Sequence, residues 1–326
     1  MYARITGWGK YLPQRVLTNK DMERMVDTTD EWILTRTGIR ERRILGDDES
    51  VSTMAVEAGK QALEVAGLSP NHIDLVIVAT NSPDRIFPAS SSLAQHGLGA
   101  KNAAAFDVIG GCSGFLQALV VAYQFIATGA YQNILVVGSE AISRVINWED
   151  RSTCVLFGDG AGAVVVQANE HETDMLGFVM GNDGSGADLL YAPSPCGRPA
   201  DAPQDGHYYL IMEGREVFRF AVTIMAEVSR QAIDAAGLQL SDIDLFIPHQ
   251  ANTRIIQAAS KSLGIPSEKV FVNVDRCGNL SAASPPLALC EAVEEGRIKE
   301  GDLVVLVAFG AGLSWAAVVL RWQPGA

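Results

Sequence analysis

The chain contains an internal duplication, and no other feature restricts its fold as strongly. Residues 61–77, QALEVAGLSPNHIDLVI, are followed 170 positions later by residues 231–247, QAIDAAGLQLSDIDLFI. Each copy has the pattern of an amphipathic helix that ends at a glycine, a short loop and a buried strand. A second echo pairs FGDGAGAVVV at 157–166 with FGAGLSWAAVV at 309–319. A period this long excludes a solenoid and predicts two related halves.

Strands and helices alternate within each half. Continuous Val/Ile/Leu runs separated by helical segments predict an α/β fold whose mainly parallel sheets are covered on both faces. We place the halves at residues 1–172 and 173–326, packed as one globular unit, with a surface insertion at 182–208. The expected strands cover residues 74–80, 103–109, 133–139, 244–248, 269–274 and 303–309, and the expected helices cover residues 90–97, 115–128, 252–263 and 284–295.

Composition narrows the range of functions. With 326 residues and 48% hydrophobic content, the chain is long enough to bury a large core. Its net charge of -13 disfavours nucleic acid and anionic membranes as partners, because both require a basic field. Five widely spaced cysteines without a CxxC pair indicate reduced thiols in the cytoplasm. We find neither the apolar stretch of a secretory signal nor an apolar run long enough to span a bilayer.

One cysteine occupies a position that favours reactivity. Cys112 follows a predicted strand in the turn GGCSG, and an apolar helix begins at Phe115. Free backbone N–H groups and the positive end of the helix dipole lower the pKa of a thiol there and favour the thiolate. Most cysteines, however, are small buried structural residues. Position alone therefore leaves both a nucleophile and a core residue open.

Two polar residues of the second half are expected to face this cysteine. His249 ends a predicted strand in PHQAN, where the repeat register places Ala79 in the first half. Asn279 lies in DRCGNLSAAS and falls opposite Cys112 once a three-residue gap is allowed. A pseudo-twofold axis between the halves would bring the three side chains together at the carboxyl ends of the strands. Sheets of this class bind their ligands there.

The segment Gly310-Ala311-Gly312 follows the last core strand. Small residues at this position allow a backbone N–H to approach a thioester oxygen, so that it forms an oxyanion hole with the N–H of Cys112. A tight turn with no catalytic role explains the same residues. Both interpretations remain open at this stage.

Three motifs together resemble a known family. IGGCSGF, PHQAN and GNLSAAS, in this order and spacing, are similar to β-ketoacyl-acyl carrier protein synthase III of the thiolase superfamily. The resemblance covers essentially the whole chain, including DEWILTRTGIRERR and AFGAGLSW. It implies a thiolase-like, five-layered αβαβα fold in a cytoplasmic homodimer without a cofactor or metal. It also implies condensation of a short acyl-coenzyme A primer with malonyl-acyl carrier protein, which starts fatty-acid synthesis.

The resemblance assigns roles to individual residues. Cys112 accepts the acyl group, while His249 and Asn279 donate hydrogen bonds to the malonyl thioester oxygen. The backbone N–H groups of Cys112 and Ala311 form the oxyanion hole. Other family positions match residues for coenzyme A (Trp32, Arg36, Arg151 and Asn252), for the carrier protein (Arg219, Arg254 and Lys261) and for the acyl pocket (Ile142, Phe157 and Leu189, with Phe87 from the partner subunit).

Two residues depart from the family pattern. Leu280 stands where the family more often has threonine, and we expect it to reshape the pocket wall. Ala311 replaces a glycine found in some members, which is a mild change because only its backbone N–H is needed.

Three other functions fit part of the pattern. A specialised relative that makes a polyketide, quinolone or long-chain β-ketone can keep Cys, His and Asn. A thiol hydrolase uses the same residue types, but the duplication and the absence of a CGSCW context count against it. The third alternative, a non-catalytic binding protein, is disfavoured by the intact set of three residues.

Overall fold

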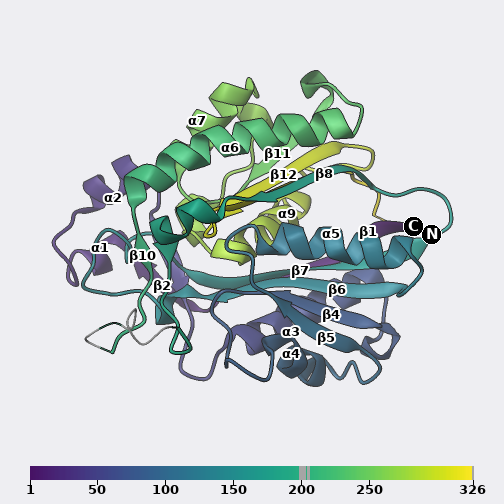
Figure 1. The fold of residues 1–326 in the computed structure, drawn as a ribbon, viewed down its shortest axis with the longest axis horizontal. Coiled ribbons are helices and arrows are strands. Elements are labelled where there is room, and N and C mark those ends of the chain that lie inside the picture. Colours follow the sequence, from purple (N-terminus) through teal and green to yellow (C-terminus); the bar gives the residue numbers. More distant parts are fainter. Residues whose placement is uncertain (198–202, 204–205, 325–326) are drawn as a thin grey trace.

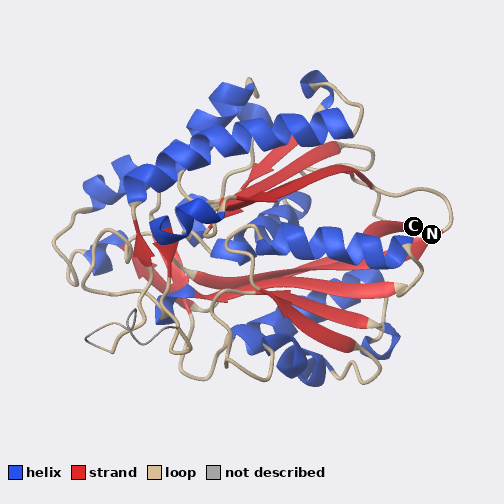
Figure 2. Ribbon diagram, in the orientation of Figure 1, coloured by secondary structure: helices blue, strands red, loops and turns tan. Residues whose placement is uncertain are grey.

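The computed structural model describes residues 1–197, 203 and 206–324. Two β-sheets lie face to face with a helical layer between them, and a further helical layer covers the outer face of each sheet (Figure 1, Figure 2). This is the five-layered αβαβα arrangement that the resemblance implied.

The two sheets arrange their equivalent strands in the same order, but the second has no strand equivalent to β5. The first, in the order β1-β7-β6-β4-β5, consists of β1 (Tyr2–Tyr11), β4 (Leu75–Ala79), β5 (Ala104–Val108), β6 (Asn133–Ala141) and β7 (Asp159–Asn169). The second, in the order β8-β13-β12-β11, consists of β8 (Met175–Asn182), β11 (Leu245–Pro248), β12 (Leu303–Gly310) and β13 (Ser314–Arg321). Two small sheets pair β2 (Arg15–Thr18) with β3 (Glu41–Ile44) and β9 (Leu190–Tyr191) with β10 (Ile211–Met212).

The helices fill the remaining layers. The outer layers are α3 (Val51–Ala66) with α4 (Ser90–Leu98) and α6 (Gly214–Ala235) with α7 (Thr253–Leu263), and the middle layer is α5 (Gly114–Ala127) with α9 (Ser284–Glu294). Short helices are α1 (Asn19–Met22), α2 (Asp30–Thr37) and α8 (Val274–Cys277). The 3-10 turns are η1 (Pro70–His72), η2 (Ile142–Arg144), η3 (Gly184–Leu189), η5 (Leu240–Asp242), η6 (Ser267–Lys269) and η7 (Ser281–Ala283).

The duplicated sequence folds twice in the same way. Helices α3 and α6 are each followed by a left-handed glycine, Gly67 (φ 66°) or Gly237 (φ 70°), then by a 3-10 turn and a buried strand. The repeated aspartate has one role in both copies. The Asp74 carboxylate accepts the N–H of Asn133 at the start of β6, and the Asp244 carboxylate accepts the N–H of Leu303 at the start of β12, both at 2.9 Å.

The sheets are mixed, so the prediction of mainly parallel sheets is wrong. Strand β4 runs parallel to β5 and β6, and β11 runs parallel to β12. Strand β7 is antiparallel to β6 and β1, and β13 is antiparallel to β12 and β8. In the second sheet, β12 turns directly into β13 at residues 310–314. A connection this short leaves no room for the helical crossover that a parallel pair requires.

The expected strand at 269–274 is also wrong. Only one bridge, Phe246 to Val270, joins this segment to β11. Beyond it the buried side chain of Gln250 takes the place of a neighbouring strand. Its Nε2 donates to the carbonyl of Phe271 at 3.1 Å, and its Oε1 accepts the N–H of Asn273 at 3.0 Å. The chain then turns into α8 instead of extending the sheet.

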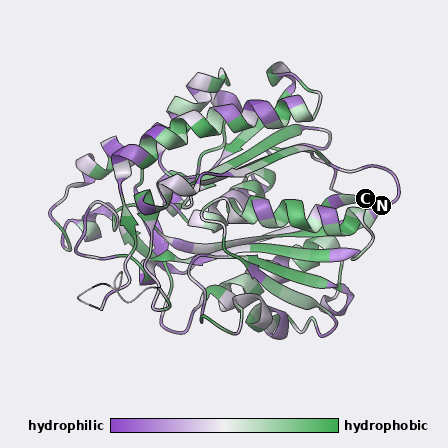
Figure 3. Ribbon diagram, viewed as in Figure 1, coloured by the Kyte–Doolittle hydropathy of each residue, from purple (hydrophilic) through white to green (hydrophobic). Residues whose placement is uncertain are grey.

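Apolar residues fill the four spaces between the five layers. Strands of both sheets are coloured mostly as hydrophobic in Figure 3. Helix α5, GFLQALVVAYQFIA, carries no charged residue, as expected for a helix covered on both sides. Its side chains pack in one cluster with residues of both sheets, such as Ile77 of β4 and Ile247 of β11.

Asp174 joins the two halves in the connection between β7 and β8. Its carboxylate accepts the N–H of Ile5 in β1 at 2.8 Å and the hydroxyl of Tyr123 in α5. Its carbonyl accepts the N–H of Arg321 in β13 at 2.7 Å. The side chain is fully buried. We propose that the halves, residues 1–172 and 173–326, meet at this link.

This buried carboxyl group predicts a pH-dependent stability. Burial raises the pKa of Asp174 from 3.8 to about 7. Between about pH 4 and pH 7, the folded state therefore keeps this carboxyl proton and the unfolded state does not, so unfolding releases it. The stability from this group is full below that window and falls by about 1.4 kcal/mol per pH unit through it. We expect Asp174→Asn to gain stability relative to the parent as the pH rises from about 5 to about 7 in urea denaturation. A constant difference between the two proteins would contradict this assignment.

Candidate active site

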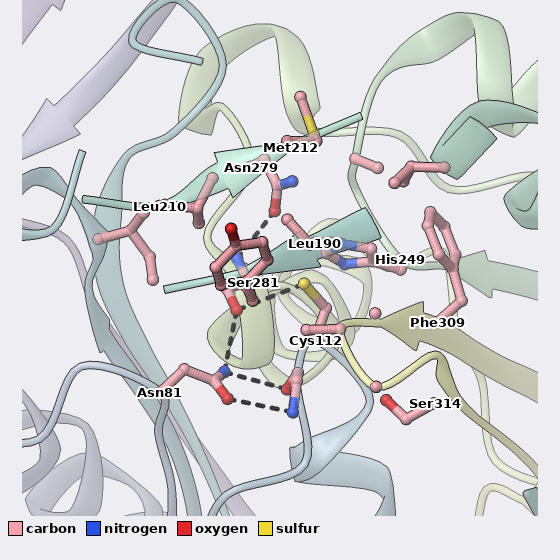
Figure 4. Close-up of a pocket in the computed structure, with 18 of the residues that line it drawn as sticks. Asn81, Cys112, Leu190, Leu210, Met212, His249, Asn279, Ser281, Phe309 and Ser314 are labelled. Carbon is pink, nitrogen blue, oxygen red and sulfur yellow. Dashed lines mark hydrogen bonds between the residues drawn. The ribbon is translucent and has the colours of Figure 1, made fainter. Parts of the chain in front are cut away.

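A cavity of about 570 Å³ opens at the carboxyl ends of the strands, and Cys112, His249 and Asn279 all line it (Figure 4). Cys112 lies in the turn from β5 to α5, and His249 follows β11. Asn279 lies directly after α8. The structure thus brings together three side chains that the duplication had predicted to converge.

The turn around Cys112 is tightly built. Gly111 has a left-handed backbone with φ 60°, and the Ser113 hydroxyl donates to the carbonyl of Gly110 at 2.8 Å. Helix α5 begins directly afterwards, at Gly114. Gly310 lies against the opposite side of the turn, where an added Cβ would come within 2.3 Å of the Cys112 nitrogen. A side chain at position 310 is therefore excluded by this close approach.

The thiol itself is buried, with an exposed fraction of 9%. Burial raises the pKa of Cys112 to about 12, the Glu140 carboxylate adds to the rise, and a hydrogen bond from Ser281 opposes it. The expectation of a lowered pKa is therefore wrong, because excluding water from a charge costs more than the helix terminus returns.

Backbone pairing fixes Asn279 in the cavity wall. Its N–H donates to the carbonyl of Leu156 at 2.9 Å, and its carbonyl accepts the N–H of Gly158 at 3.1 Å. Its Oδ1 accepts the N–H of Ser281 at 2.8 Å. This bond sets the orientation of the amide and leaves Nδ2 as the free donor (Figure 4). The buried Arg42 supports the same segment, since its guanidinium donates to the carbonyl of Val155 at 2.7 Å.

His249 is a neutral imidazole. It is 1% exposed, and its ring meets Phe309 edge to face at 5.5 Å. Burial lowers the pKa of His249 from 6.5 to about 3. Its Nδ1 has no hydrogen-bond partner among the residues that the structure describes. A neutral ring of this kind donates a hydrogen bond without readily giving up its proton.

The loop at 310–312 lies beside Cys112 and also forms the turn between β12 and β13. Ala311 lines the cavity, and its backbone abuts Gly111, where an added Cβ would meet the Ala311 nitrogen at 2.8 Å. The Ser314 hydroxyl, at the end of the loop, donates to the carbonyl of Gly110 at 2.9 Å. The interpretation of this loop as a tight turn and its interpretation as part of an oxyanion hole are therefore compatible, because the turn holds small residues against the Cys112 backbone.

The residues expected to bind coenzyme A gather around one indole. The guanidinium carbons of Arg36 and Arg151 lie 5.1 and 5.3 Å from the ring centroid of Trp32. Arg151 also donates to the carbonyl of Asp27 at 2.6 Å. Asn252 lies apart from this group, in the cavity wall, where its side chain caps α7 through the N–H of Ile255 at 2.9 Å. Two cations and an aromatic ring are suited to phosphates and a base.

The three expected carrier-protein residues are exposed on α6 and α7. The guanidinium of Arg254 lies 5.5 Å from the ring of Phe218, which lines the cavity. Arg219 pairs with Glu216 at 3.0 Å, and Lys261 lies in the last turn of α7.

The expected acyl-pocket residues divide into two groups. Ile142 and Phe157 line the cavity, but Leu189 does not, because the adjacent Leu190 of β9 faces it instead. Phe87 is 82% exposed and does not line the cavity of its own chain.

Leu280 does not form part of the cavity wall. It is fully buried in a separate apolar cluster with Cys277, Ala283 and Leu287. The expectation that it reshapes the pocket is therefore wrong, since its side chain points into the core.

Comparison with known proteins identifies the family. Models of 3-oxoacyl-acyl-carrier-protein synthase III and of its C-terminal part match residues 106–184 and 233–322. The β-ketoacyl-acyl-carrier-protein synthase III of Caldanaerobacter subterraneus is 52% identical over 324 residues, covering 98% of both chains. The chain belongs to the β-ketoacyl-acyl carrier protein synthase III family. The family member from Roseiflexus castenholzii is 51% identical, covering 99% of both chains.

Solved structures of the β-ketoacyl-acyl carrier protein synthase III family confirm the thiolase-like fold. The enzyme from Aquifex aeolicus superposes with a TM-score of 0.92 at 50% identity, covering 98% of this chain and 100% of that one. The priming β-ketosynthase of the R1128 polyketide pathway has a TM-score of 0.94 at 40% identity, covering 99% and 97%.

Three residues beneath Cys112 were not predicted from the sequence of this family member. Asn81 and Ser281 line the cavity, and Glu140 is fully buried directly behind Asn81. Asn81 and Glu140 follow or end strands β4 and β6, so the rule that placed His249 at a strand end applied to them as well. The sequence did contain one signal for this cluster, because Glu140 is the charged residue of the buried strand β6.

Within the described residues, no helix is long and apolar enough to cross a membrane. In the same part of the chain, no three His, Cys, Asp or Glu side chains are grouped as a metal site.

Proposed function

We propose that this protein joins a short acyl-coenzyme A to malonyl-acyl carrier protein by decarboxylative condensation, giving a 3-oxoacyl-acyl carrier protein that starts type II fatty-acid synthesis. The observation that carries this proposal is the convergence of Cys112, His249 and Asn279 in one cavity of a chain that belongs to this family. The protein is an acyltransferase that works without a cofactor or metal, and we assign it to the cytoplasm.

The first half of the reaction uses Cys112. Its sulfur attacks the acyl-coenzyme A thioester, the carbonyl–sulfur bond of coenzyme A breaks, and coenzyme A leaves with the thiol proton. The backbone N–H groups of Cys112 and Ala311 stabilise the oxyanion of this step. Trp32, Arg36 and Arg151 bind the nucleotide end of coenzyme A, and Asn252 contacts its pantetheine arm.

The second half uses His249 and Asn279. The malonyl thioester loses carbon dioxide, and the electron pair of the broken bond becomes an enolate whose oxygen accepts hydrogen bonds from both side chains. Because burial keeps His249 neutral with a pKa of about 3, neither donor readily protonates the carbanion. The carbanion attacks the acyl-cysteine, the new carbon–carbon bond forms, and the thiolate of Cys112 leaves and recovers a proton.

Acylation of Cys112 tests the function directly. We expect acetyl- or branched acyl-coenzyme A to add its acyl mass to the Cys112 peptide, and malonyl-acyl carrier protein to discharge it as a 3-oxoacyl product. Hydrolysis without condensation would indicate a thiol hydrolase. The likeness to the R1128 priming β-ketosynthase supports a polyketide role as the second candidate, and discharge only by a polyketide carrier protein would favour it.

Docking of the acidic carrier protein involves Arg219, Arg254 and Lys261 on α6 and α7. We expect Arg254→Glu to lower turnover with malonyl-acyl carrier protein by about tenfold or more, because it reverses a charge at the cavity mouth. Acylation by acyl-coenzyme A is expected to change little. Lys60→Glu on α3 is the matched control, since its charge change is the same on the outer helix of the other sheet. Equal loss of both half-reactions in Arg254→Glu would argue against this docking site.

We also propose a homodimer. Strand β5 lies at the edge of its sheet, which leaves backbone groups available for pairing with a second copy. Phe87 and Ile109, 82% and 76% exposed, give this side an apolar surface. Phe87 then reaches the acyl pocket of the partner. Light scattering that gives the mass of a single 34.8 kDa chain would contradict the dimer.

A further inference from the structure

A fully buried glutamate lies behind the nucleophile. Glu140 is the second-to-last residue of β6, and its carboxylate accepts hydrogen bonds from neutral groups. Its Oε1 accepts from Asn81 Nδ2 at 2.6 Å and from the N–H of Ala282 at 3.3 Å. Its Oε2 accepts from the Ser82 hydroxyl at 2.6 Å, the N–H of Asn81 at 3.0 Å and the Thr80 hydroxyl at 3.3 Å. Each oxygen therefore faces a backbone N–H, which can only donate.

The carboxylate sets the orientation of Asn81. Because Glu140 repels an amide oxygen, Nδ2 must face it, and Oδ1 then accepts the N–H of Gly111 at 3.1 Å. Nδ2 also lies 3.1 Å from the carbonyl of Gly111 and 3.2 Å from the Ser281 hydroxyl (Figure 4). The amide thus holds both backbone groups of the residue that precedes Cys112.

Ser281 carries the effect to the sulfur. Asn81 Nδ2 has two hydrogens, one that faces Glu140 and one that the Gly111 carbonyl and the Ser281 oxygen share. The Ser281 oxygen therefore accepts from Nδ2 and can donate its own single proton to another group. The Cys112 sulfur lies 3.4 Å from that oxygen. The N–H of Ser281 is occupied separately by Asn279 Oδ1 at 2.8 Å. The Ser281 hydroxyl therefore donates to the sulfur of Cys112 in this arrangement, and the Glu140 carboxylate is the second acceptor that competes for its proton.

We propose that Glu140 and Asn81 are positioning residues that direct the Ser281 hydroxyl at the sulfur of Cys112, so that this hydroxyl stabilises the thiolate formed during acylation. The inference rests on the proposed role of Cys112 as the acyl acceptor. The charge of Glu140 acts in the opposite sense, since a nearby carboxylate disfavours a thiolate. Two other titratable side chains line the cavity, Tyr191 and His249, and His249 is neutral. The two effects of Glu140 therefore predict opposite results for Glu140→Gln. Loss of the orientation disfavours the Cys112 thiolate, whereas loss of the negative charge favours it.

Glutamine cannot reproduce the orientation. Both carboxylate oxygens accept a backbone N–H, from Asn81 and from Ala282, so the amide nitrogen of a glutamine has to face a donor. The fixed N–H of Asn81, with its shorter bond, takes the glutamine oxygen. The glutamine nitrogen then faces Asn81 Nδ2, and the Asn81 amide rotates. Asn81 Oδ1 would then attract the Ser281 proton away from sulfur.

Alkylation of the thiol by iodoacetamide tests this chain of bonds without substrate. Reaction at Cys112 is followed by peptide mass spectrometry in a Cys196→Ser background, because Cys196 is the exposed cysteine of the described residues. Ser281→Gly deletes the hydroxyl and suits the left-handed backbone, φ 49°, at this position. We expect it to lower the alkylation rate at about pH 8 by about tenfold, because a rise of about one unit in the pKa of the Cys112 thiol lowers the thiolate population by that factor. Glu140→Gln is expected to lower the rate as well, although it removes a negative charge.

A second readout separates positioning from general damage. Ser281→Gly keeps the N–H that holds Asn279, so decarboxylation of a malonyl thioester is expected to stay within about twofold of the parent rate. An unchanged or faster alkylation rate in either variant would overturn the proposal. So would an equal loss of alkylation and decarboxylation in Ser281→Gly. If Glu140→Gln does not fold, Ser281→Gly decides alone. Failure of acyl-coenzyme A to label the parent Cys112 would instead refute the proposed function, whatever the alkylation series shows.

Discussion

Replacing Cys112 with serine is expected to lower condensation by at least about a thousandfold, while decarboxylation of the malonyl thioester continues. Serine is nearly the same size, so the close contact with Gly310 and the bond with Ser281 remain possible. Its hydroxyl is a far weaker nucleophile than a thiol. His249 and Asn279 are unchanged, so the enolate still forms.

The two activities are measured separately. Condensation is followed as 3-oxoacyl product from acyl-coenzyme A and malonyl-acyl carrier protein, and decarboxylation is followed as carbon dioxide released without a primer. Cys290→Ser is a suitable control, since this cysteine is buried beside Gly9 and away from the cavity. Loss of both activities in Cys112→Ser, at an unchanged melting temperature, would show that Cys112 does more than hold the primer.

Asn279→Asp is expected to give the reverse pattern. Aspartate keeps an oxygen for the N–H of Ser281, which holds the wall of the cavity in place. The donor Nδ2, however, becomes an oxygen with a negative charge, at the point where the enolate oxygen develops its own charge. Removing one such donor costs about 100- to 1000-fold in rate, and the added repulsion increases the loss.

Acylation of Cys112 by acyl-coenzyme A is the internal control for this variant. We expect the labelled peptide to form at a rate within about threefold of the parent, because Asn279 does not take part in that half-reaction. Asn279→Ala distinguishes the two contributions, since it removes the donor without adding a charge. If Asn279→Asp decarboxylates as fast as the parent, the amide does not bind the enolate.

Much of the site was predictable because its positions follow local rules. Strand ends and the turns after them are visible as periodicity and as glycine content, which places Cys112 and His249 correctly. Asn279 required the repeat register in addition, and the register held although its segment is not a strand. The segment at 269–274 was mispredicted as a strand, because the side chain of Gln250 takes the hydrogen-bonding place of a neighbouring strand. Gln250 reaches this segment only once β11 is in place.

The ionisation of the site was not predictable. A helix terminus beside Cys112 is visible in the sequence, but the depth of burial that raises the pKa of its thiol to about 12 depends on every layer around it. The same burial holds His249 neutral. Water exclusion is a property of the packed molecule, and no local pattern records it.

Helix and strand periodicity and turn chemistry act over a few residues, so the sequence alone determined the duplication and the convergence of Cys112, His249 and Asn279. The resemblance of its motifs gave the family and the five-layered fold. Only the tertiary structure decided what lies beneath Cys112. Asn81 contacts Glu140 across 59 positions and Ser281 across 200. The bond to Glu140 forms once β4 and β6 pair within the first half, whereas the bond to Ser281 forms only once the two halves of the chain have packed. Packing also orients the donors. The direction of the bond to the sulfur follows from that arrangement.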